Sequence, residues 1–323
     1  MKILVTGASG VIGRRVVPLL MATSHEVTAI ARTPEKRAQL ARAGAVAIEL
    51  DLFDPTATRR ALEGQDAVVN LATHMPSSSV AMLLPAAWRE NDRIRRIGAA
   101  TLVDAAISVG VGRFMQESFA PVYPDGGDDW IDETCPIHPA RYNRTVADAE
   151  AAAARFMNSG RSGVVLRFAA FYGPDARHVT DLIQFVKRGF APIPGAPTAF
   201  ISSVSHDDAA AAAVAALGVS SGIYNVADDC PVRHREFVDS LADALNVPHP
   251  TLPPLWMAPL FGSVGEALTR SLRISNGKLR GASGWAPGYA SVREGWRAIV
   301  RGAQLTTRSV GVAGTQVKGR DAD

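Results

Sequence analysis

Short apolar runs alternate along the first half of the chain with longer stretches in which apolar side chains recur every three to four residues. Such runs predict buried strands, and the longer periodicity predicts amphipathic helices. The expected strands are Lys2–Thr6, Glu26–Ala31, Val46–Leu50, Ala67–Leu71, Arg113–Glu117 and Ser162–Phe168. The expected helices are Val11–Thr23, Pro34–Ala43, Thr56–Leu62, Trp88–Val109 and Tyr142–Asn158. This alternation predicts an α/β fold with a doubly wound parallel sheet.

Composition and charge narrow the function classes. The 323 residues carry a net charge of +3 without a lysine- or arginine-rich block, so we expect no nucleic-acid partner. Cys135 and Cys230 lack metal-ligand spacing, so neither a disulfide framework nor a metal site is expected. No secretory leader precedes the first strand, and the alanine-rich run Ala209–Leu217 is too short to span a bilayer. We therefore expect a cytoplasmic protein without membrane contact.

The first strand leads into a glycine-rich turn that opens the first helix. The turn has the sequence Thr6-Gly7-Ala8-Ser9-Gly10-Val11-Ile12-Gly13. Glycines at this spacing permit a tight turn, the close approach of a pyrophosphate and close packing of the helix on the strand. The free N–H groups and the dipole of the helix N-terminus favour phosphates. We therefore expect a dinucleotide in a Rossmann-type fold, contacted by Gly7, Ser9, Gly10, Val11, Ile12 and Gly13.

Residues after the second and third strands bear on which dinucleotide binds. An acidic residue after the second strand would accept hydrogen bonds from the ribose hydroxyls and repel a 2′-phosphate. Arg32 stands there instead, and Arg14 could assist it, which favours NADP(H) over NAD(H). The alternative is that both arginines are solvated surface residues. Asp51 and Leu52 are placed to contact the adenine, unless Asp51 is only a turn or helix-cap residue.

The second half of the chain has a different pattern. Glycine and proline become frequent in Gly189–Pro197 and again in Pro248–Pro259. We expect a smaller C-terminal lobe over the carboxyl ends of the strands, where open α/β sheets bind ligands. Residues 1–175 form the predicted NADP(H)-binding domain, to which 200–228 returns. Residues 176–199 and 229–305 form the predicted substrate-binding lobe, and 306–323 a disordered tail.

The chain resembles the extended short-chain dehydrogenase/reductase family, also called the NAD-dependent epimerase/dehydratases, over roughly residues 1–300. The motifs that carry the resemblance include Thr6–Gly13, Asp51-Leu52, Asn70–Thr73, Asn91, Val122-Tyr123, Tyr142, Arg167, Tyr172–Pro174, His206–Ala209 and Gly222–Val226. Their order and spacing together are specific. The resemblance implies a nicotinamide cofactor contacted by Leu71, Ala72 and Thr73, and a small-molecule substrate between the two lobes. It also leaves a homodimer open.

The resemblance further implies a catalytic tyrosine, a lysine four residues later that lowers the tyrosine pKa, and a serine or threonine that orients the substrate. Tyr142 stands at the tyrosine position, but Val146 stands at the lysine position. An unperturbed tyrosine has a pKa of about 10, so only about one molecule in a thousand is phenolate at pH 7. Arg144 is expected to point away from Tyr142, since two residues along a helix diverge by about 200°.

The orienting hydroxyl is displaced as well. Its position is occupied by Phe119, and Ser118 lies one residue earlier, where a strand turns its side chain to the other face. Ser118 serves the reaction only if the following loop is re-registered; otherwise it is structural. His74, after the fourth strand, is a candidate replacement because imidazole titrates near neutral pH. The alternative for His74 is a surface loop residue.

We therefore predict an atypical NADP(H)-dependent oxidoreductase that acts on a small, apolar carbonyl or alcohol substrate, with Tyr142, His74 and Ser118 as candidate catalytic residues. Two alternatives stay open. One is a redox-neutral epimerase, dehydratase or cyclase that retains its cofactor. The other is a non-catalytic NADP(H)-binding sensor or scaffold, which the missing lysine suggests.

Overall fold

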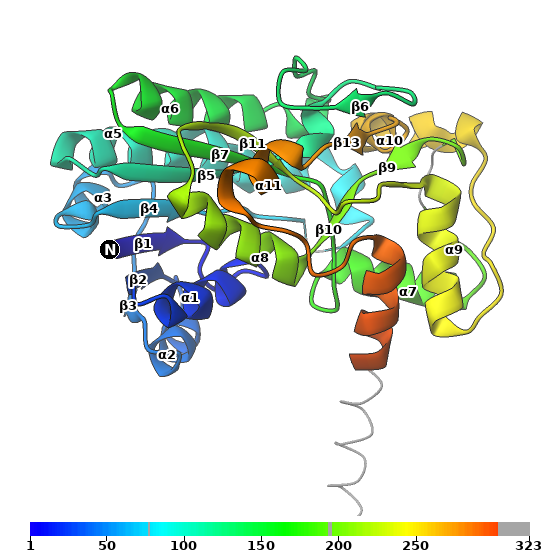
Figure 1. Cartoon of the computed structure of the whole chain (residues 1–323), viewed down its shortest axis with the longest axis horizontal. Coiled ribbons are helices and arrows are strands. Elements are labelled where there is room, and N and C mark those ends of the chain that lie inside the picture. Colours follow the sequence, from blue (N-terminus) through cyan, green and yellow to red (C-terminus); the bar gives the residue numbers. More distant parts are fainter. Residues whose placement is uncertain (77, 193–195, 303–323) are drawn as a thin grey trace, which may run out of the picture.

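The computed structural model describes residues 1–76, 78–192 and 196–302, so the tail predicted over 306–323 lies outside the described residues. Its centre is a seven-stranded sheet with the order β11-β7-β5-β4-β1-β2-β3, in which all neighbours pair in parallel (Figure 1). The strands are β1 (Lys2–Thr6), β2 (Glu26–Ile30), β3 (Val46–Ile48), β4 (Ala67–Asn70), β5 (Arg113–Phe119), β7 (Ser162–Phe168) and β11 (Gly222–Val226). The strand order reverses beside β1, which confirms the predicted Rossmann-type sheet.

Helices cover both faces of the sheet (Figure 1). One face carries α3 (Pro55–Leu62), α5 (Ala99–Val109) and α6 (Val146–Asn158), and the other carries α1 (Gly13–Ala22), α2 (Pro34–Arg42) and α8 (His206–Ala215). Along β1, Ile3 and Val5 belong to the core under α1, whereas Leu4 belongs to the core under α5. Strands buried on both faces in this way are apolar throughout, which is why periodicity and run length located them.

The long helix predicted over Trp88–Val109 is interrupted. It consists of a 3-10 turn η2 (Pro85–Trp88), α4 (Arg89–Arg93), a π-helical turn η3 (Ile94–Gly98) and α5. A π turn inserts one extra residue per turn, and such turns are frequent at functional sites. Here it accompanies an arginine, Arg95, that is buried rather than directed to solvent. Periodicity in the sequence indicated a helix but could not indicate the change of hydrogen bonding.

The segment around Tyr142 also differs from the prediction. Tyr142 lies in a 3-10 turn, η5 (Arg141–Asn143), and α6 begins only at Val146. Tyr142 and Val146 therefore do not share one regular α-helix. The chain enters this turn from Pro139-Ala140, in extended conformation at Ala140.

Three small sheets and a further set of helices build the C-terminal lobe. The strand pairs are β8 (Ala170–Tyr172) with β10 (Ser203–Ser205), β9 (Phe200–Ile201) with β12 (Val232–Arg233), and β6 (Trp130–Ile131) with β13 (Arg273–Ile274). The helices are α7 (Arg177–Lys187), α9 (His234–Leu245), α10 (Gly262–Leu268) and α11 (Gly277–Ser283). The remaining short turns are η1 (Ala81–Leu83), η4 (Ala120–Val122), η6 (Ala216–Gly218) and η7 (Leu255–Phe261).

Part of the lobe has its own apolar core, whereas β6, β13 and α11 pack on a core of the main sheet. Tyr172, Phe237 and Trp296 pack in a core separate from the two cores of the sheet. Between the strands of the lobe the chain returns through α8 to β11, which pairs with β7 at the edge of the main sheet. Within the described ranges, no helix combines the length and the apolar character needed to cross a bilayer.

Candidate active site

The glycine-rich turn connects β1 to α1 and has no room for side chains at two of its glycines. Gly7 has φ +62°, and a Cβ on it would lie 2.3 Å from the Leu71 carbonyl oxygen. A Cβ on Gly13 would lie 2.2 Å from the Gly7 carbonyl oxygen. No side chain caps the N-terminus of α1, although the N–H groups of Arg14 and Arg15 donate to the carbonyl oxygens of Gly10 and Ile12. An uncapped helix start behind a backbone cradle fits a dinucleotide pyrophosphate.

A buried chain of hydrogen bonds holds the strand ends beside this turn. The Thr6 hydroxyl donates to the Asn70 amide oxygen at 2.5 Å and accepts the N–H groups of Leu71 and Ala72, each at 3.2 Å. The Asn70 amide nitrogen donates to the Gln116 side chain at 2.8 Å. These bonds fix the carboxyl ends of β1, β4 and β5 against one another. Sequence reasoning missed Gln116, although a polar side chain within an apolar strand was a signal.

Arg32 and Asp51 lie where sequence reasoning placed them, at the ends of β2 and β3. The Arg32 side chain is 68% exposed, and Glu90 approaches its guanidinium only to 4.0 Å. The Asp51 carboxylate accepts the Phe53 N–H at 3.0 Å, so Asp51 does shape a turn. Leu52 packs against the core beneath α5.

Arg14 has a different neighbour from the one expected. Its guanidinium forms an ion pair with Asp175 at 2.7 Å, and Arg15 contacts both Asp175 and Asp207. Burial alone would raise the pKa of the Asp175 carboxyl, but the two arginines hold it below its usual value. Asp175 lines the same cleft as the glycine turn. The structure therefore places Arg14 in a charged cluster at this end of the cleft and does not pair it with Arg32.

A cleft of about 320 Å³ runs from the glycine turn to Tyr142. Its lining is mainly apolar and aromatic. The lining residues are Gly7, Gly10, Val11, Ile12, Gly13, Leu71, Thr73, Met75, Pro76, Ser78, Met82, Trp88, Arg95, Glu117, Phe119, Tyr142, Phe168, Phe171, Asp175, Ala176, Arg177, His178 and His206. The structure thus brings the predicted glycine turn and Tyr142 into one cavity. The other predicted cofactor residues that do not line it are Ser9, Arg14, Arg32, Asp51, Leu52 and Ala72.

Tyr142 stands at the far end of the cleft, with its ring edge-on to Trp88 at 5.0 Å between centroids. Burial raises the pKa of the Tyr142 hydroxyl to about 12, and the charges of Arg95 and Arg270 only partly offset that rise. The hydroxyl is therefore neutral at physiological pH and available as a hydrogen-bond donor. Val146 is fully buried and Arg144 is exposed, and neither lines the cleft.

Ser118 and His74 lie away from Tyr142. The Ser118 hydroxyl donates to Glu150 at 2.5 Å, and Glu150 accepts two further bonds from Arg167, at 2.8 and 2.7 Å. Phe119, the next residue along β5, lines the cleft instead, as strand alternation predicts. His74 is exposed; its backbone N–H donates to the Asn91 side chain at 3.0 Å. The structure does not bring Ser118 or His74 together with Tyr142.

A buried ion pair that the sequence analysis missed stands in the cleft. Arg95 donates from Nη2 to the Glu117 carboxylate at 3.2 Å, with the two side chains 6% and 10% exposed. Arg95 comes from the π turn η3, and Glu117 lies two residues before Phe119 on the same face of β5. The signal in the sequence was a glutamate within an otherwise buried strand.

Two histidines line the opposite part of the cleft. Burial lowers the pKa of His206 to about 4 and also lowers that of His178, so both rings are neutral at physiological pH. His206 packs directly under Gly173, where a Cβ would lie 2.1 Å from its Nδ1 atom. These rings contribute shape to the cleft without charge.

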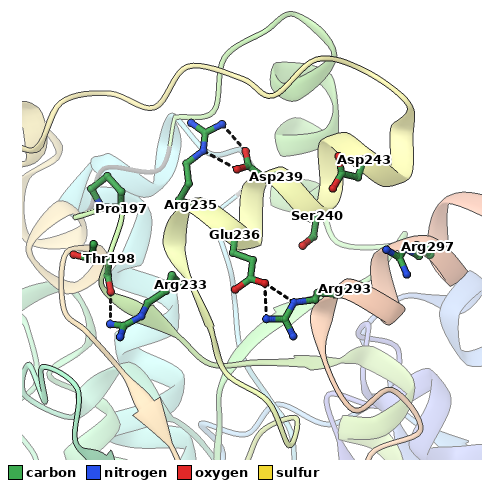
Figure 2. A pocket seen from close by; sticks show the side chains of 10 residues that line it. All are labelled: Pro197, Thr198, Arg233, Arg235, Glu236, Asp239, Ser240, Asp243, Arg293 and Arg297. Atoms are coloured by element: carbon green, nitrogen blue, oxygen red, sulfur yellow. Dashed lines mark hydrogen bonds and ion pairs between the residues drawn. The ribbon is translucent and has the colours of Figure 1, made fainter.

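A second hollow, about 520 Å³ in volume, lies in the C-terminal lobe and is lined by charged side chains (Figure 2). Three of its arginines are paired locally: Arg235 with Asp239 at 2.5 Å, Arg293 with Glu236, and Arg233 with Asp128 at 2.6 Å. Figure 2 shows the Arg235–Asp239 pair along α9 and the Glu236–Arg293 pair between α9 and the segment that carries Arg293. This second hollow contains neither the glycine turn nor Tyr142. We therefore take the cleft that contains both as the candidate active site.

Comparison with known proteins agrees with this geometry. Residues 3–227 match the model of the NAD dependent epimerase/dehydratase family. A Streptomyces protein named 3-diazoavenalumate denitrifying reductase is 31% identical over 313 residues, covering 91% of this chain and 99% of the relative. The 2-alkyl-3-oxoalkanoate reductase of Stenotrophomonas maltophilia is 27% identical over 270 residues, covering 77% of each chain. A human epimerase family protein solved with NADPH superposes with a TM-score of 0.77 at 20% identity, covering 93% of this chain and 99% of that one.

Proposed function

Because the chain belongs to the NAD dependent epimerase/dehydratase family, we propose that it is an NADP(H)-dependent reductase of a small, apolar carbonyl substrate. One observation carries the proposal. A neutral tyrosine lines the same, mainly apolar cleft as the glycine turn. A nicotinamide held in this cleft supplies a hydride, and the chain's own residues must then supply a proton and the orientation.

The high pKa of Tyr142 favours reduction over oxidation. When a carbonyl carbon gains a hydride, its oxygen becomes an alkoxide, which is a stronger base than a phenolate and takes the Tyr142 proton. Oxidation of an alcohol needs the phenolate form, which with a pKa of about 12 is only about one molecule in 10⁵ at pH 7. A site without the lysine therefore still performs reduction, because that direction uses the protonated hydroxyl.

The cofactor preference rests on Arg32. Its guanidinium is largely exposed at the end of β2 and is paired with Glu90 only at 4.0 Å, so most of its donors are available to a 2′-phosphate. The substrate class rests on the lining, where apolar side chains, among them Met82, Trp88, Phe119 and Phe171, outnumber polar ones. Aromatic walls of this kind suit a flat apolar body rather than a sugar nucleotide.

The test is transfer of deuterium from stereospecifically labelled NADPH to aryl and alkyl ketones and 3-oxoalkanoates. We expect label in the product, and a fall in kcat of roughly 10²- to 10⁴-fold for Tyr142→Phe. Turnover without any change in cofactor absorbance would instead favour the redox-neutral alternative. NADPH binding that alters a partner's affinity, without label transfer and without any effect of Tyr142→Phe, would favour a sensor.

The missing lysine and the Streptomyces relative support a second candidate reaction, the reductive removal of a diazo group. One hydride and an arenediazonium ion, R–N₂⁺, give R–H and N₂, so no alkoxide forms and no proton is transferred. Because this reaction transfers no proton, the presence of Val146 at the lysine position does not impair it. Release of labelled N₂ from a ¹⁵N-labelled arenediazonium, undiminished in Tyr142→Phe, would identify this reaction, whereas carbonyl reduction requires Tyr142.

A further inference from the structure

We propose that Arg95 binds a carboxylate of the substrate, so that this cleft takes an apolar acid rather than an uncharged ketone. The inference rests on the proposed function and names the substrate class of that same site. It starts from a buried guanidinium whose hydrogen bonds are incomplete. Arg95 lines the cleft, is nearly inaccessible to solvent, and its Nε atom has no hydrogen-bond partner in the described residues.

The hydrogen bonds of Arg95 leave its buried Nε–H without an acceptor. Glu117 accepts from the Nη2 atom of Arg95 through both of its carboxylate oxygens, at 3.2 and 3.5 Å. A guanidinium presents five N–H donors on a planar fork, and its Nε edge is a standard site for a second planar anion. Glu117 thus holds the group in place while the Nε–H still requires an acceptor.

Leaving that donor unsatisfied is costly. A buried N–H without a partner is rare in folded proteins and requires an acceptor, which at a ligand cavity is a water molecule or the ligand itself. All of the arginines near the cleft are ion-paired, but the others are partly or largely exposed: Arg14 and Arg15 pair with Asp175, and Arg177 pairs with Asp181 at 3.3 Å. Arg95 is the buried cation among them and is therefore the one positioned to recognise an anion.

The neighbouring residues determine the shape of such a ligand. Tyr142 and Arg95 line the same end of the cleft, and Trp88 stacks edge-on against Tyr142. Phe119 continues the aromatic wall from the strand that also carries Glu117. A substrate with its reacting carbon near Tyr142, a flat apolar body along the aromatic rings and a carboxylate at Arg95 satisfies all three features.

Binding without turnover tests the inference. The probes are 3-phenylpropanoate and its uncharged amide, titrated calorimetrically into the protein saturated with NADP⁺. We expect the acid to bind more tightly than the amide in the wild type, since a charge-assisted bond is about twice as strong as a neutral one. In Arg95→Gln the affinity for the acid should fall roughly 10- to 100-fold, while the affinity for the amide changes little.

Three controls keep the result interpretable. Removing Arg95 alone leaves the buried Glu117 carboxylate without a counter-charge. The double variant Arg95→Met/Glu117→Met removes both charges and should show the same loss of preference for the acid. Arg96→Met changes an exposed arginine of the same π turn, paired with Asp148 at the surface, and should leave both probes unaffected. The NADPH dissociation constant should not change in either Arg95 variant.

Equal binding of acid and amide by the wild type would overturn the inference, as would a parallel loss of NADPH affinity in Arg95→Gln, which would assign Arg95 to the cofactor. Its failure is distinct from failure of the proposed function. Selective binding of the acid without any hydride transfer would support the carboxylate site and contradict the proposed reductase activity. Hydride transfer without selectivity would do the reverse.

Discussion

The hydroxyl of Ser118 donates a hydrogen bond of 2.5 Å to Glu150, on the opposite side of β5 from the cleft lined by Phe119. Glu150 is in turn held by Arg167, whose Nη1 also donates to the Tyr123 hydroxyl at 2.8 Å. The serine nearest the expected catalytic position is thus part of a buried structural network.

Ser118→Ala is therefore expected to lower stability and spare catalysis. The Glu150 carboxylate keeps its two bonds from Arg167 but loses one donor, which costs about 1–2 kcal/mol in the free energy of unfolding. Urea unfolding measures that loss, and kcat should stay within about twofold of wild type. Tyr142→Phe is the matched comparison, for which we expect a loss of activity and only a small decrease in the free energy of unfolding. A large loss of kcat in Ser118→Ala at unchanged stability would place the serine in the reaction instead.

Gly13→Ala should abolish dinucleotide binding. Its Cβ would lie 2.2 Å from the Gly7 carbonyl oxygen and 2.7 Å from the Ala8 Cα, both backbone atoms, so the turn must move. Fluorescence titration with NADPH and a thermal melt measure the two consequences. Gly112→Ala is the control, because the nearest neighbour of a Cβ at this position is the Asp66 carbonyl oxygen, at an ordinary contact distance of 3.7 Å. Normal NADPH affinity in Gly13→Ala would show that the turn is not the pyrophosphate site.

Arg32→Asp should reverse the cofactor preference. The change removes an exposed cation from the end of β2 and adds a carboxylate that repels a 2′-phosphate and accepts from ribose hydroxyls. We expect the ratio of the NADH to the NADPH dissociation constant to fall by roughly 10- to 100-fold, which corresponds to the free energy of one charge-assisted hydrogen bond. Arg42→Asp, the same charge change at the exposed end of α2, should leave the ratio unaltered. An unaltered ratio in Arg32→Asp would remove the structural reason for preferring NADP(H).

Asp228 should make stability depend on pH. Burial raises the pKa of its carboxyl to about 8, although Ser203 donates to it at 2.9 Å. Between about pH 4 and pH 8 the unfolded chain has lost this proton and the folded chain retains it, so the free energy of unfolding falls as pH rises. The slope from this one group is at most about 1.4 kcal/mol per pH unit.

Asp228→Asn should flatten that dependence, because the amide mimics the protonated acid and does not titrate. Urea midpoints at pH 5 and pH 8 measure the difference between the variant and the wild type. Asp129→Asn, at an exposed aspartate, should retain the wild-type slope. Equal slopes in wild type and Asp228→Asn would show that Asp228 is ionised in the folded protein.

The sequence by itself determined the parts of this protein that depend on local pattern. The bounds predicted for Lys2–Thr6 and Ser162–Phe168 match β1 and β7, because a strand buried on both faces is a continuous apolar run between turn residues. The glycine turn was readable because backbone crowding at Gly7 and Gly13 excludes every other residue type. The replacement of the lysine by Val146 was readable from spacing alone.

Only the tertiary structure decided which polar side chains share the cleft. Arg95 and Glu117 are separated by 22 residues and meet because a π turn and the alternation of β5 direct both inward, and neither feature leaves a pattern in residue order. The same packing places the Ser118 hydroxyl against Glu150, the Arg14 guanidinium against Asp175 and His74 at the surface. Local propensity fixes which residues form an element, whereas the direction of a side chain depends on how elements from distant parts of the chain pack against each other.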